Sequence, residues 1–353
     1  MIKIAIFYNL KPGGGTNMVK NIVREISKRN ILIDLYSHQN NSIKDTNSTY
    51  IFPIKKTKNS IQQIYQALTE IKKVQKNIAK NIMNINYDAI FVFPCYITQS
   101  PHILRYLPKN KTYYFFLEPK REFYERTSFD YMSLKRILSR IVRFPIKHLD
   151  QINCKSIDKI ITISKFSQYN LKKIYNKESI VVYPGAKQIS PKKIIKANNH
   201  NFLSLGLISM LKGHHLSQKI CPQVRIYGAF SNENTKNIIF KKHIIQTKII
   251  DKEIKNIYKK HTFFLANQIN EPFGLTTLEA TNNNCYVLGN NLGGTSEIIS
   301  NNINGQLIPV KNFNLSKKIL KLYDKKNTIY FRKNYIIDWS YTTNIILKII
   351  NHE

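Results

Sequence analysis

Residues 262–280 read TFFLANQINEPFGLTTLEA and join a strand to a helix through a tight loop. The apolar run 262–265 predicts a buried strand, and the run from Leu275 predicts the start of a helix. Pro272 and Gly274 predict a loop between this strand and this helix, because these residues interrupt regular structure and permit sharp turns. A buried strand that passes through a loop into a helix is the repeating unit of a parallel α/β sheet.

The same alternation of strands and helices extends in both directions from this stretch. Apolar runs in the second half predict further strands at 202–205, 224–227, 286–288 and 306–309. Runs in the first half predict strands at 3–8, 31–36, 51–53, 89–93, 112–117 and 157–163, and a helical stretch at about 60–83. Strands that are separated by helices indicate a parallel sheet in each half.

A change of composition separates the two halves. The segment 187–200 is polar and basic, and we expect it to be an interdomain linker. Residues 1–186 and 201–337 are then two Rossmann-like domains of an α/β protein, and we expect them to face a central cleft where ligands bind. The length of 353 residues fits two domains of ordinary size.

The composition excludes several classes of protein. A hydrophobic fraction of 42% is sufficient for ordinary cores and argues against a disordered chain. No apolar run reaches the ~20 residues of a membrane-spanning helix, and the N-terminus is too short and strand-like for a signal peptide, so we expect a cytoplasmic protein. The cysteines form no CxxC pair and no Cys/His cluster, which supports neither a zinc site nor a disulfide framework.

The chain is strongly basic. It carries 55 Lys and Arg against 21 Asp and Glu, a formal net charge of +34. A positive field attracts anionic lipid surfaces, nucleic acid and phosphorylated substrates, although codon bias in an A/T-rich genome is another origin of abundant Lys, Asn and Ile. The basic residues are spread along the chain and do not alternate with aromatics, so we expect no nucleic-acid partner.

Residues 132–143 (MSLKRILSRIVR) combine basic and apolar positions. The apolar residues fall at helical spacing on one face, and the Lys and Arg residues fall largely elsewhere. Such a helix can lie on an anionic bilayer, which would hold the protein peripherally on the inner face of a membrane. The alternative is a surface helix that packs on its own domain.

The loop and helix at 270–280 place acids and backbone amides as a sugar nucleotide requires. Amides at a helix N-terminus bind phosphate, and Gly274 lets a ligand approach the backbone closely. Glu279 lies one turn into the helix, within reach of a sugar on those phosphates, and Glu271 precedes the loop and can face the other end of the ligand. The alternative is an acid and a helix cap in an unrelated α/β protein.

Glu271–Leu275 followed by Leu278–Ala280 resembles the glutamate-x7-glutamate motif of family 4 retaining glycosyltransferases (glycosyl transferases group 1), which have the two-domain GT-B fold. Other similar stretches follow in the order of the family: GGG at 13–15, SKFS at 164–167, VVYPG at 181–185, LG at 205–206, KG at 212–213 and LGGTSEII at 292–299. DWSY at 338–341 resembles the start of the last helix, and the resemblance implies that a helix at about 338–351 packs back on the first domain.

The resemblance also implies residue roles. Glu271 would be the catalytic residue that faces the donor hexose, Glu279 would bind the ribose, and Lys212 would neutralise the diphosphate. The expected donor-binding residues are Gly14, Gly15, Lys212, Gly213, Phe273, Gly274, Leu275 and Glu279. On the acceptor side we expect Glu118 and Arg121. The alternatives are a surface lysine at 212 and a plain strand-to-helix turn at 13–15.

The chain departs from the family pattern at two positions. Leu207 stands where the family usually has an arginine, which removes one cationic partner of the phosphate. Leu117 stands at the position of a histidine that many members carry near the end of a strand. His102 is near another strand end, where a lone loop histidine is expected to be solvated.

These features predict a retaining hexosyltransferase. It would move a hexose from a nucleotide-diphosphate sugar to a glycan or lipid-linked acceptor, in cell-envelope or polysaccharide synthesis. No Asp-x-Asp pair is placed to hold a metal, so we expect neither a metal nor a cofactor, with fixed amides stabilising the leaving diphosphate. The alternatives are a sugar-nucleotide enzyme of the same fold that does not transfer, such as an epimerase, and a basic nucleic-acid-binding protein.

Overall fold

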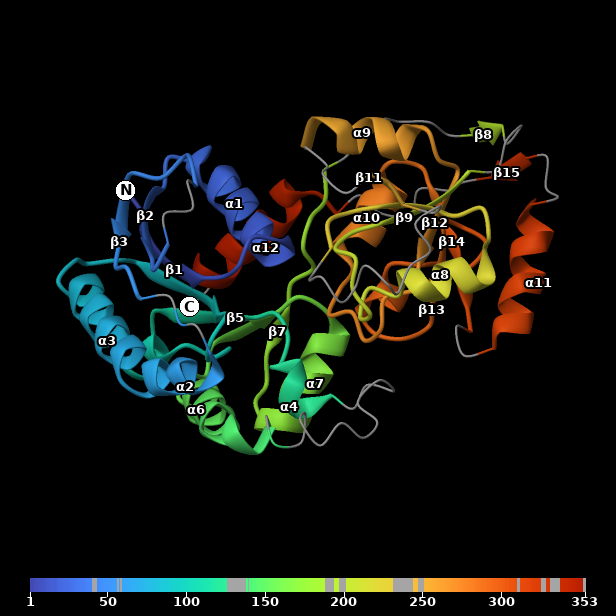
Figure 1. Cartoon of the computed structure of the whole chain (residues 1–353). Helices are drawn as coiled ribbons and strands as arrows, with labels where there is room; N and C mark the ends of the chain where they lie inside the picture. Colours follow the sequence, from blue (N-terminus) through green and yellow to red (C-terminus); the bar gives the residue numbers. More distant parts are fainter. Residues whose placement is uncertain are drawn as a thin grey trace. The chain divides into compact units, whose positions relative to one another are not determined.

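A computed structural model divides the chain into two compact units, Met1–Tyr183 with Thr342–Glu353, and Pro184–Tyr341 (Figure 1). The structure describes residues 1–39, 43–55, 57, 59–125, 138, 140–187, 194–196, 201–230, 244–246, 251–309, 312–324, 328–330 and 337–351. Most of the expected linker at 187–200 and most of the basic segment 132–143 therefore lie outside the described residues.

The first unit contains a parallel sheet of seven strands in the order β3-β2-β1-β4-β5-β6-β7. Five of these strands are the ones expected from the apolar runs, while β3 lies just before the strand expected at 51–53 and overlaps it only at Ile51. The seventh, β7, is two residues long, too short to predict from the sequence. Strands β1 and β4 are buried along nearly their whole length, which is typical of a parallel sheet covered by helices on both faces. The strands are β1 (Lys3–Asn9), β2 (Leu32–Ser37), β3 (Ser48–Ile51), β4 (Ala89–Cys95), β5 (Thr112–Phe116), β6 (Ile160–Thr162) and β7 (Ile180–Val181).

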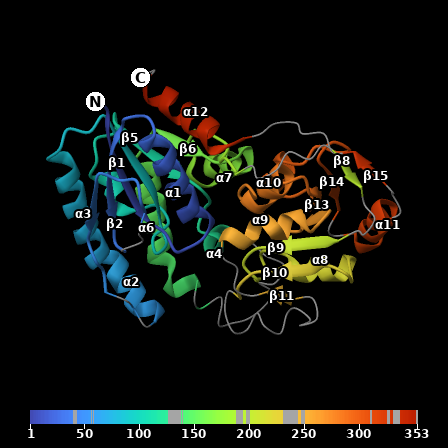
Figure 2. The same ribbon diagram turned by 90° about the horizontal axis from the view of Figure 1, so that it is seen from above.

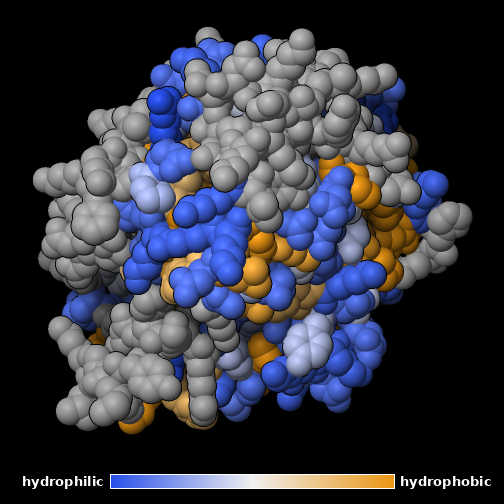
Figure 3. All heavy atoms as spheres, turned by 90° about the vertical axis from the view of Figure 1, so that its right-hand side faces the viewer, coloured by the Kyte–Doolittle hydropathy of each residue, from blue (hydrophilic) through white to orange (hydrophobic). Residues whose placement is uncertain are grey.

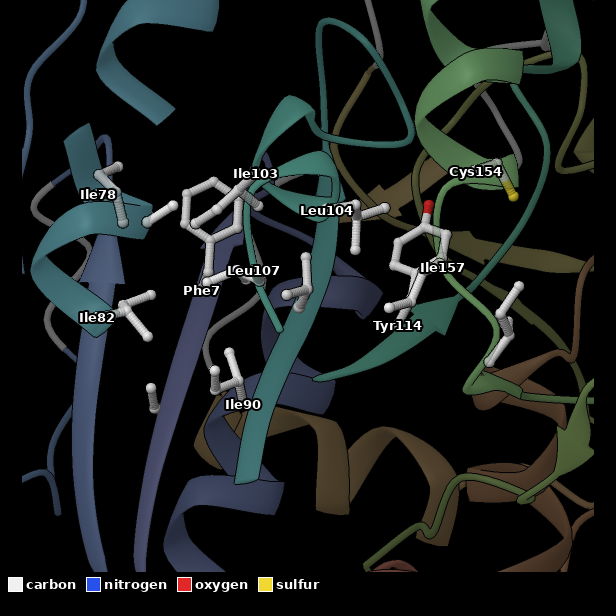
Figure 4. Close-up of a cluster of buried hydrophobic side chains, with 14 of the residues drawn as sticks. Phe7, Ile78, Ile82, Ile90, Ile103, Leu104, Leu107, Tyr114, Cys154 and Ile157 are labelled. Carbon is white, nitrogen blue, oxygen red and sulfur yellow. The ribbon is translucent and has the colours of Figure 1, made fainter. Parts of the chain in front are cut away.

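Helices cover both faces of this sheet (Figures 1 and 2). Helix α1 lies on one face beside α12, where Arg29 Nη2 donates to Asn344 Oδ1 over 2.6 Å. Figure 4 shows the core on the other face, where Ile78 and Ile82 of α3 pack toward Phe7 of β1. The helices are α1 (Gly14–Ser27), α2 (Ser60–Leu68), α3 (Glu70–Met83), η1 (His102–Arg105), α4 (Arg121–Tyr124), α6 (Phe144–Lys155), α7 (Lys165–Tyr175) and α12 (Trp339–Asn351), of which the residues from Thr342 onward belong to this unit.

The helical stretch expected at 60–83 is two helices. Thr69 ends α2 and begins α3 with backbone angles of φ −115° and ψ −81°, which are not helical. The carboxylate of Glu70 accepts hydrogen bonds from the Lys55 amide (3.1 Å) and from Gln66 Nε2 (3.0 Å). These bonds tie the junction to the chain before α2, a long-range constraint that the helical periodicity does not reveal.

The second unit contains a parallel sheet of six strands in the order β11-β10-β9-β12-β13-β14. Helices α8 and α11 contribute to the hydrophobic cluster on one face, and α9 and α10 contribute to the cluster on the other. The elements are β9 (Phe202–Leu205), α8 (His214–Ile220), β10 (Arg225–Tyr227), β11 (Ile244–Gln246), α9 (Asp251–Lys259), β12 (Phe263–Ala266), α10 (Leu275–Asn282), β13 (Tyr286–Asn290), η4 (Gly294–Glu297), β14 (Gly305–Ile308) and α11 (Phe313–Asp324), with β8 (Ile194–Lys196) and β15 (Thr328–Tyr330) paired antiparallel.

The surface carries exposed apolar side chains among the polar ones. Figure 3 shows this mixture on the side of the second unit that carries α11. In the first unit, the described part of the basic segment exposes Leu138 (59%), Ile141 (64%) and Val142 (47%). Leu134 and Ile137, the other two apolar positions of the expected helix face, lie outside the described residues, so both interpretations of this segment stay predictions. Among the described residues, no helix is both long enough and apolar enough to cross a membrane.

Candidate functional site

Three loops of the second unit meet at one edge of its sheet. They follow β9, β12 and β13, which are adjacent and parallel, so their carboxyl ends lie together. The Ile269 amide donates to the Leu211 carbonyl over 2.8 Å, which joins the first loop to the second. The Gly294 amide donates to the Glu271 carbonyl over 2.7 Å, which joins the third loop to the second.

The N-terminus of α10 lies in the middle loop. Gly274 precedes the helix with φ 101°, and no side chain caps the helix. A Cβ atom at this position would lie 2.9 Å from Thr295 Oγ1, so both the backbone angle and the space favour glycine. The hydroxyl oxygens of Thr277 and Thr295 are buried beside Gly274 without a hydrogen-bond partner. The amides of this turn and its helix dipole form the kind of site that binds phosphate.

Lys212 and Glu271, which the sequence analysis assigns to the diphosphate and the hexose, bind each other. Lys212 Nζ lies 2.7 Å from Glu271 Oε1 and 2.9 Å from Oε2. The two side chains are 33% and 13% exposed, so the pair is open to solvent on the lysine side. Gly213 determines the path of the chain after Lys212: its φ is 67°, and a Cβ atom there would lie 1.9 Å from the Asn267 carbonyl oxygen.

Two glycines after β13 support the loop that carries Glu271. A Cβ atom at Gly293 would lie 2.7 Å from the backbone nitrogen and oxygen of Glu271. A Cβ atom at Gly294 would lie 2.2 Å from the Pro272 carbonyl oxygen. The stretch LGGTSEII therefore contributes a backbone surface against which the Glu271 loop packs, and this contact explains why two glycines are adjacent there.

Glu279 lies one turn into α10 and has a partner that the sequence analysis missed. Tyr258 of α9 donates its hydroxyl to Glu279 Oε2 over 3.0 Å. Burial, and secondarily the charge of Glu279, hold the pKa of Tyr258 well above its ordinary value. The tyrosine therefore keeps its proton and serves as a hydrogen-bond donor to the carboxylate.

His214 is a second residue that the sequence analysis missed. It follows Gly213 at the start of α8 and is 1% exposed, with Nδ1 2.8 Å from Ser204 Oγ. Burial lowers the pKa of His214 to about 4, with a smaller contribution from the charge of Lys212, so the ring is neutral near pH 7. It therefore does not replace the charge of the arginine that is absent at Leu207, whose side chain is 49% exposed.

Gly14 and Gly15 lie in the first unit, at the start of α1. No side chain caps this helix. A Cβ atom at Gly15 would lie 3.1 Å from a methyl carbon of Leu10 and 3.2 Å from one of Leu117. The leucine at the expected histidine position therefore packs against the glycine loop.

Glu118 and Arg121 also lie in the first unit, after β5, where Arg121 Nε binds Glu118 Oε2 over 2.6 Å. Loops after β1, β4 and β5 meet there: the Tyr96 amide donates to the Asn9 carbonyl (2.8 Å), and Gln99 Nε2 donates to the Glu118 carbonyl (2.7 Å).

Lys120 is almost wholly enclosed in the same group of loops. Its side chain is 11% exposed and lies 3.8 Å from Glu122. Burial lowers the pKa of Lys120 below its ordinary value, against the opposing effect of Glu122. This edge of the first unit thus holds two largely enclosed cations, Lys120 and Arg121, next to partly exposed acids.

The expectation that His102 is solvated is wrong. The side chain is fully buried in η1, and its Nε2 lies 2.8 Å from the Ala67 carbonyl oxygen. Burial lowers its pKa to about 4. His102 is a neutral structural residue, which its position near a strand end did not reveal.

Part of the chain is similar in sequence to known proteins. Residues 185–336 match the family described as "Glycosyl transferases group 1". An uncharacterized glycosyltransferase of Methanocaldococcus jannaschii is 26% identical over 181 residues, which cover 48% of this chain and 50% of that protein. The match therefore spans about half the length of this relative.

Solved structures resemble the whole chain. Sucrose-phosphate synthase from Thermosynechococcus elongatus has a TM-score of 0.74 at 12% identity, with 100% of this chain and 99% of that chain covered. HepE of Anabaena, solved in complex with UDP and glucose, has a TM-score of 0.66 at 16% identity, with both chains covered completely. WaaG, a glycosyltransferase involved in lipopolysaccharide biosynthesis, has a TM-score of 0.67 at 13% identity, with 98% and 95% covered. These likenesses confirm the expected α/β fold of the GT-B type.

Proposed function

Since residues 185–336 match the family described as "Glycosyl transferases group 1", we propose that the protein is a retaining hexosyltransferase whose donor is a nucleotide-diphosphate sugar. The observation that carries this proposal is the pairing of Lys212 with Glu271 on loops that adjoin the uncapped N-terminus of α10. A cation, a carboxylate and the amides of a helix N-terminus are the groups that a departing diphosphate and a reacting sugar require. HepE, the similar protein solved with UDP and glucose, supports a donor of this class.

In the proposed reaction, the charge on the diphosphate increases as the glycosidic bond breaks. The amides of Phe273, Gly274 and Leu275 and the dipole of α10 stabilise that charge without reorganising. Lys212 exchanges the Glu271 carboxylate for the diphosphate, which leaves Glu271 to face the donor hexose. Protein groups thus take the place of a metal ion at the diphosphate.

The acceptor of the proposed reaction is a glycan or a lipid-linked sugar, as in cell-envelope or polysaccharide synthesis. It would bind the first unit where the loops after β1, β4 and β5 meet, and the ion pair of Glu118 and Arg121 offers it both an acceptor and a donor of hydrogen bonds. The roles of Gly14 and Gly15 toward the donor diphosphate remain predictions from the family resemblance.

We further propose that the protein works in the cytoplasm as a peripheral protein on an anionic membrane. The net charge of +34 and the exposed side chains of Leu138, Ile141 and Val142 support this location. A basic, partly apolar surface would bring the active protein to a lipid-linked acceptor.

The first experiment is a thermal shift screen with UDP-, GDP-, ADP- and CDP-hexoses, because a ligand that binds only the folded state raises the apparent melting temperature. The donor that raises it is then incubated with lipid-linked and glycan acceptors. We expect a glycosylated product with the anomeric configuration of the donor retained. Consumption of the donor without any glycosylated product would instead indicate an epimerase-like enzyme.

Glu271→Gln tests the catalytic residue with that donor. We expect the rate of transfer to fall by ~10²–10³, because a fixed charge at the reacting sugar is lost, while the melting temperature and donor affinity change little. Glu178→Gln is the matched control, since Glu178 pairs with Lys172 on the surface and is 77% exposed. Normal turnover of the Glu271 variant would exclude a catalytic role for this carboxylate.

A further inference from the structure

We infer that Tyr258 is a positioning residue that orients Glu279 toward the ribose of the donor and so makes the site selective for ribonucleotides. The inference rests on the proposed function, in which Glu279 binds the ribose. It adds a residue of α9 to a site that the sequence motif locates only in α10 and its loop.

The contact is direct and specific in geometry. The Tyr258 hydroxyl lies 3.0 Å from Glu279 Oε2 and 3.3 Å from the Thr276 carbonyl oxygen, in the first turn of the same helix. A hydroxyl has one proton to donate, and a carboxylate is the stronger acceptor. Tyr258 therefore holds one oxygen of Glu279, and its hydroxyl lies beside the first turn of α10, which would bind phosphate.

Packing immobilises the tyrosine. Tyr258 is 1% exposed and belongs to the hydrophobic cluster of Leu203, Phe264, Ala280 and Cys285 between α9, α10 and the sheet. The Cys285 thiol lies 3.4 Å from the carbonyl oxygen of Tyr258 and 3.3 Å from that of His261, so it packs the end of α9 against the start of β13. A hydrogen-bond donor held in place by packing also restricts the orientation of the carboxylate that it binds.

A fixed carboxylate binds a ligand better than a mobile one. Glu279 is half-buried on a helix, and an unrestrained glutamate has several rotamers that binding would have to restrict. A carboxylate has about four acceptor positions, so the bond from Tyr258 is compatible with bonds from ribose hydroxyls. Preorganisation of this kind favours ligands that carry those hydroxyls over ligands that lack them.

Isothermal titration with UDP, GDP, ADP and CDP, each against its 2′,3′-dideoxy counterpart, tests the inference on Tyr258→Phe. This variant removes the hydroxyl and keeps the ring in its cluster. For the diphosphate that binds the parent most tightly, we expect the parent to prefer the ribonucleotide by at least ~10-fold, as bonds to a charged group imply. In the variant we expect that preference to fall by ~5-fold or more, with the affinity for the dideoxy compound nearly unchanged.

Tyr175→Phe is the matched control, because Tyr175 is also buried and donates its hydroxyl to a carboxylate, Asp150 Oδ2, over 2.6 Å in the first unit. We expect this variant to lower the melting temperature and to keep the ribose preference of the parent. If Tyr258→Phe loses stability but keeps the preference of the parent, Tyr258 is structural only and the inference is wrong.

Glu279→Ala separates this inference from the proposed function. We expect the ribose preference to disappear in Glu279→Ala and to fall no further when Tyr258→Phe is added, because the tyrosine acts through the carboxylate. A parent without any ribose preference would overturn the role of Glu279 itself. A parent with a preference that Glu279→Ala abolishes and Tyr258→Phe leaves intact would overturn the inference alone.

Discussion

In the proposed function, the Lys212–Glu271 ion pair holds two residues of the donor site together before the ligand binds. The pair is partly exposed, so its contribution to stability is small, ~1 kcal/mol or less. A diphosphate offers the lysine more negative charge than one carboxylate does. In the proposed reaction, the lysine would therefore exchange the carboxylate for the diphosphate, and the ion pair would keep both side chains near the donor until then.

Lys212→Ala should weaken donor binding by ~10-fold or more, because a charge-assisted contact to the diphosphate is lost. Titration of the donor found in the thermal shift screen measures this effect. Lys172→Ala is the control, since Lys172 pairs with Glu178 on the surface and is 53% exposed. Equal donor affinities of the two variants would show that Lys212 does not bind the diphosphate.

The candidate site of the second unit is formed by the loops that follow three of its strands. The loops after β9, β12 and β13 approach one another more closely than side chains would permit at Gly213, Gly293 and Gly294. Each of these glycines therefore permits a backbone contact that keeps Lys212 or Glu271 in place. The contacts at these three positions are made by backbone atoms and leave no space for a side chain.

Gly213→Ala should lower stability by ~2–4 kcal/mol, because the new methyl group would collide with the Asn267 backbone in addition to the strain at φ 67°. Denaturant unfolding measures the loss. Gly206→Ala is the control for strain alone, since Gly206 has φ 141° and no atom within 4 Å of an added Cβ. If the Gly213 variant were as stable as the Gly206 variant, the predicted collision with the Asn267 backbone would be wrong.

The whole molecule combines a strong positive charge with exposed apolar residues. The formal net charge is +34, and electrostatic attraction alone would bring such a protein to an anionic surface. Leu138 and Ile141 are 59% and 64% exposed, so they are available to enter the interface between lipid headgroups and acyl chains. Charge and apolar insertion differ in their response to salt and to mutation.

The protein should sediment with anionic phosphatidylglycerol vesicles at low salt and much less at ~0.5 M salt, because high ionic strength screens the attraction. Replacement of Leu138 and Ile141 by Ser should reduce binding at low salt while net charge and melting temperature stay unchanged. The control replaces Ile180 and Leu315, which are 49% and 43% exposed, by Ser. Undiminished binding of the first variant would leave diffuse electrostatics as the explanation.

Much of the fold could be predicted because buried parallel strands have a distinctive signature. The runs at 3–8, 89–93 and 262–265 are almost wholly apolar, and all three are central strands of a sheet. Short strands such as β7 and β11 carry too few residues for such a pattern. The break at Thr69 was missed because helical periodicity continues through it, and the bond between Glu70 and Lys55 beside it joins residues 15 positions apart.

The sequence by itself determined the order of strands and helices, the two α/β units and the loop with Glu271 and Glu279, because local periodicity and turn residues encode these features. Only the tertiary structure decided that Lys212 binds Glu271, 59 residues away, and that Tyr258 binds Glu279, 21 residues away. Such contacts depend on the register of strands and on the face that each helix presents to its sheet. Those quantities result from the packing of the whole core, so no short stretch of sequence specifies them.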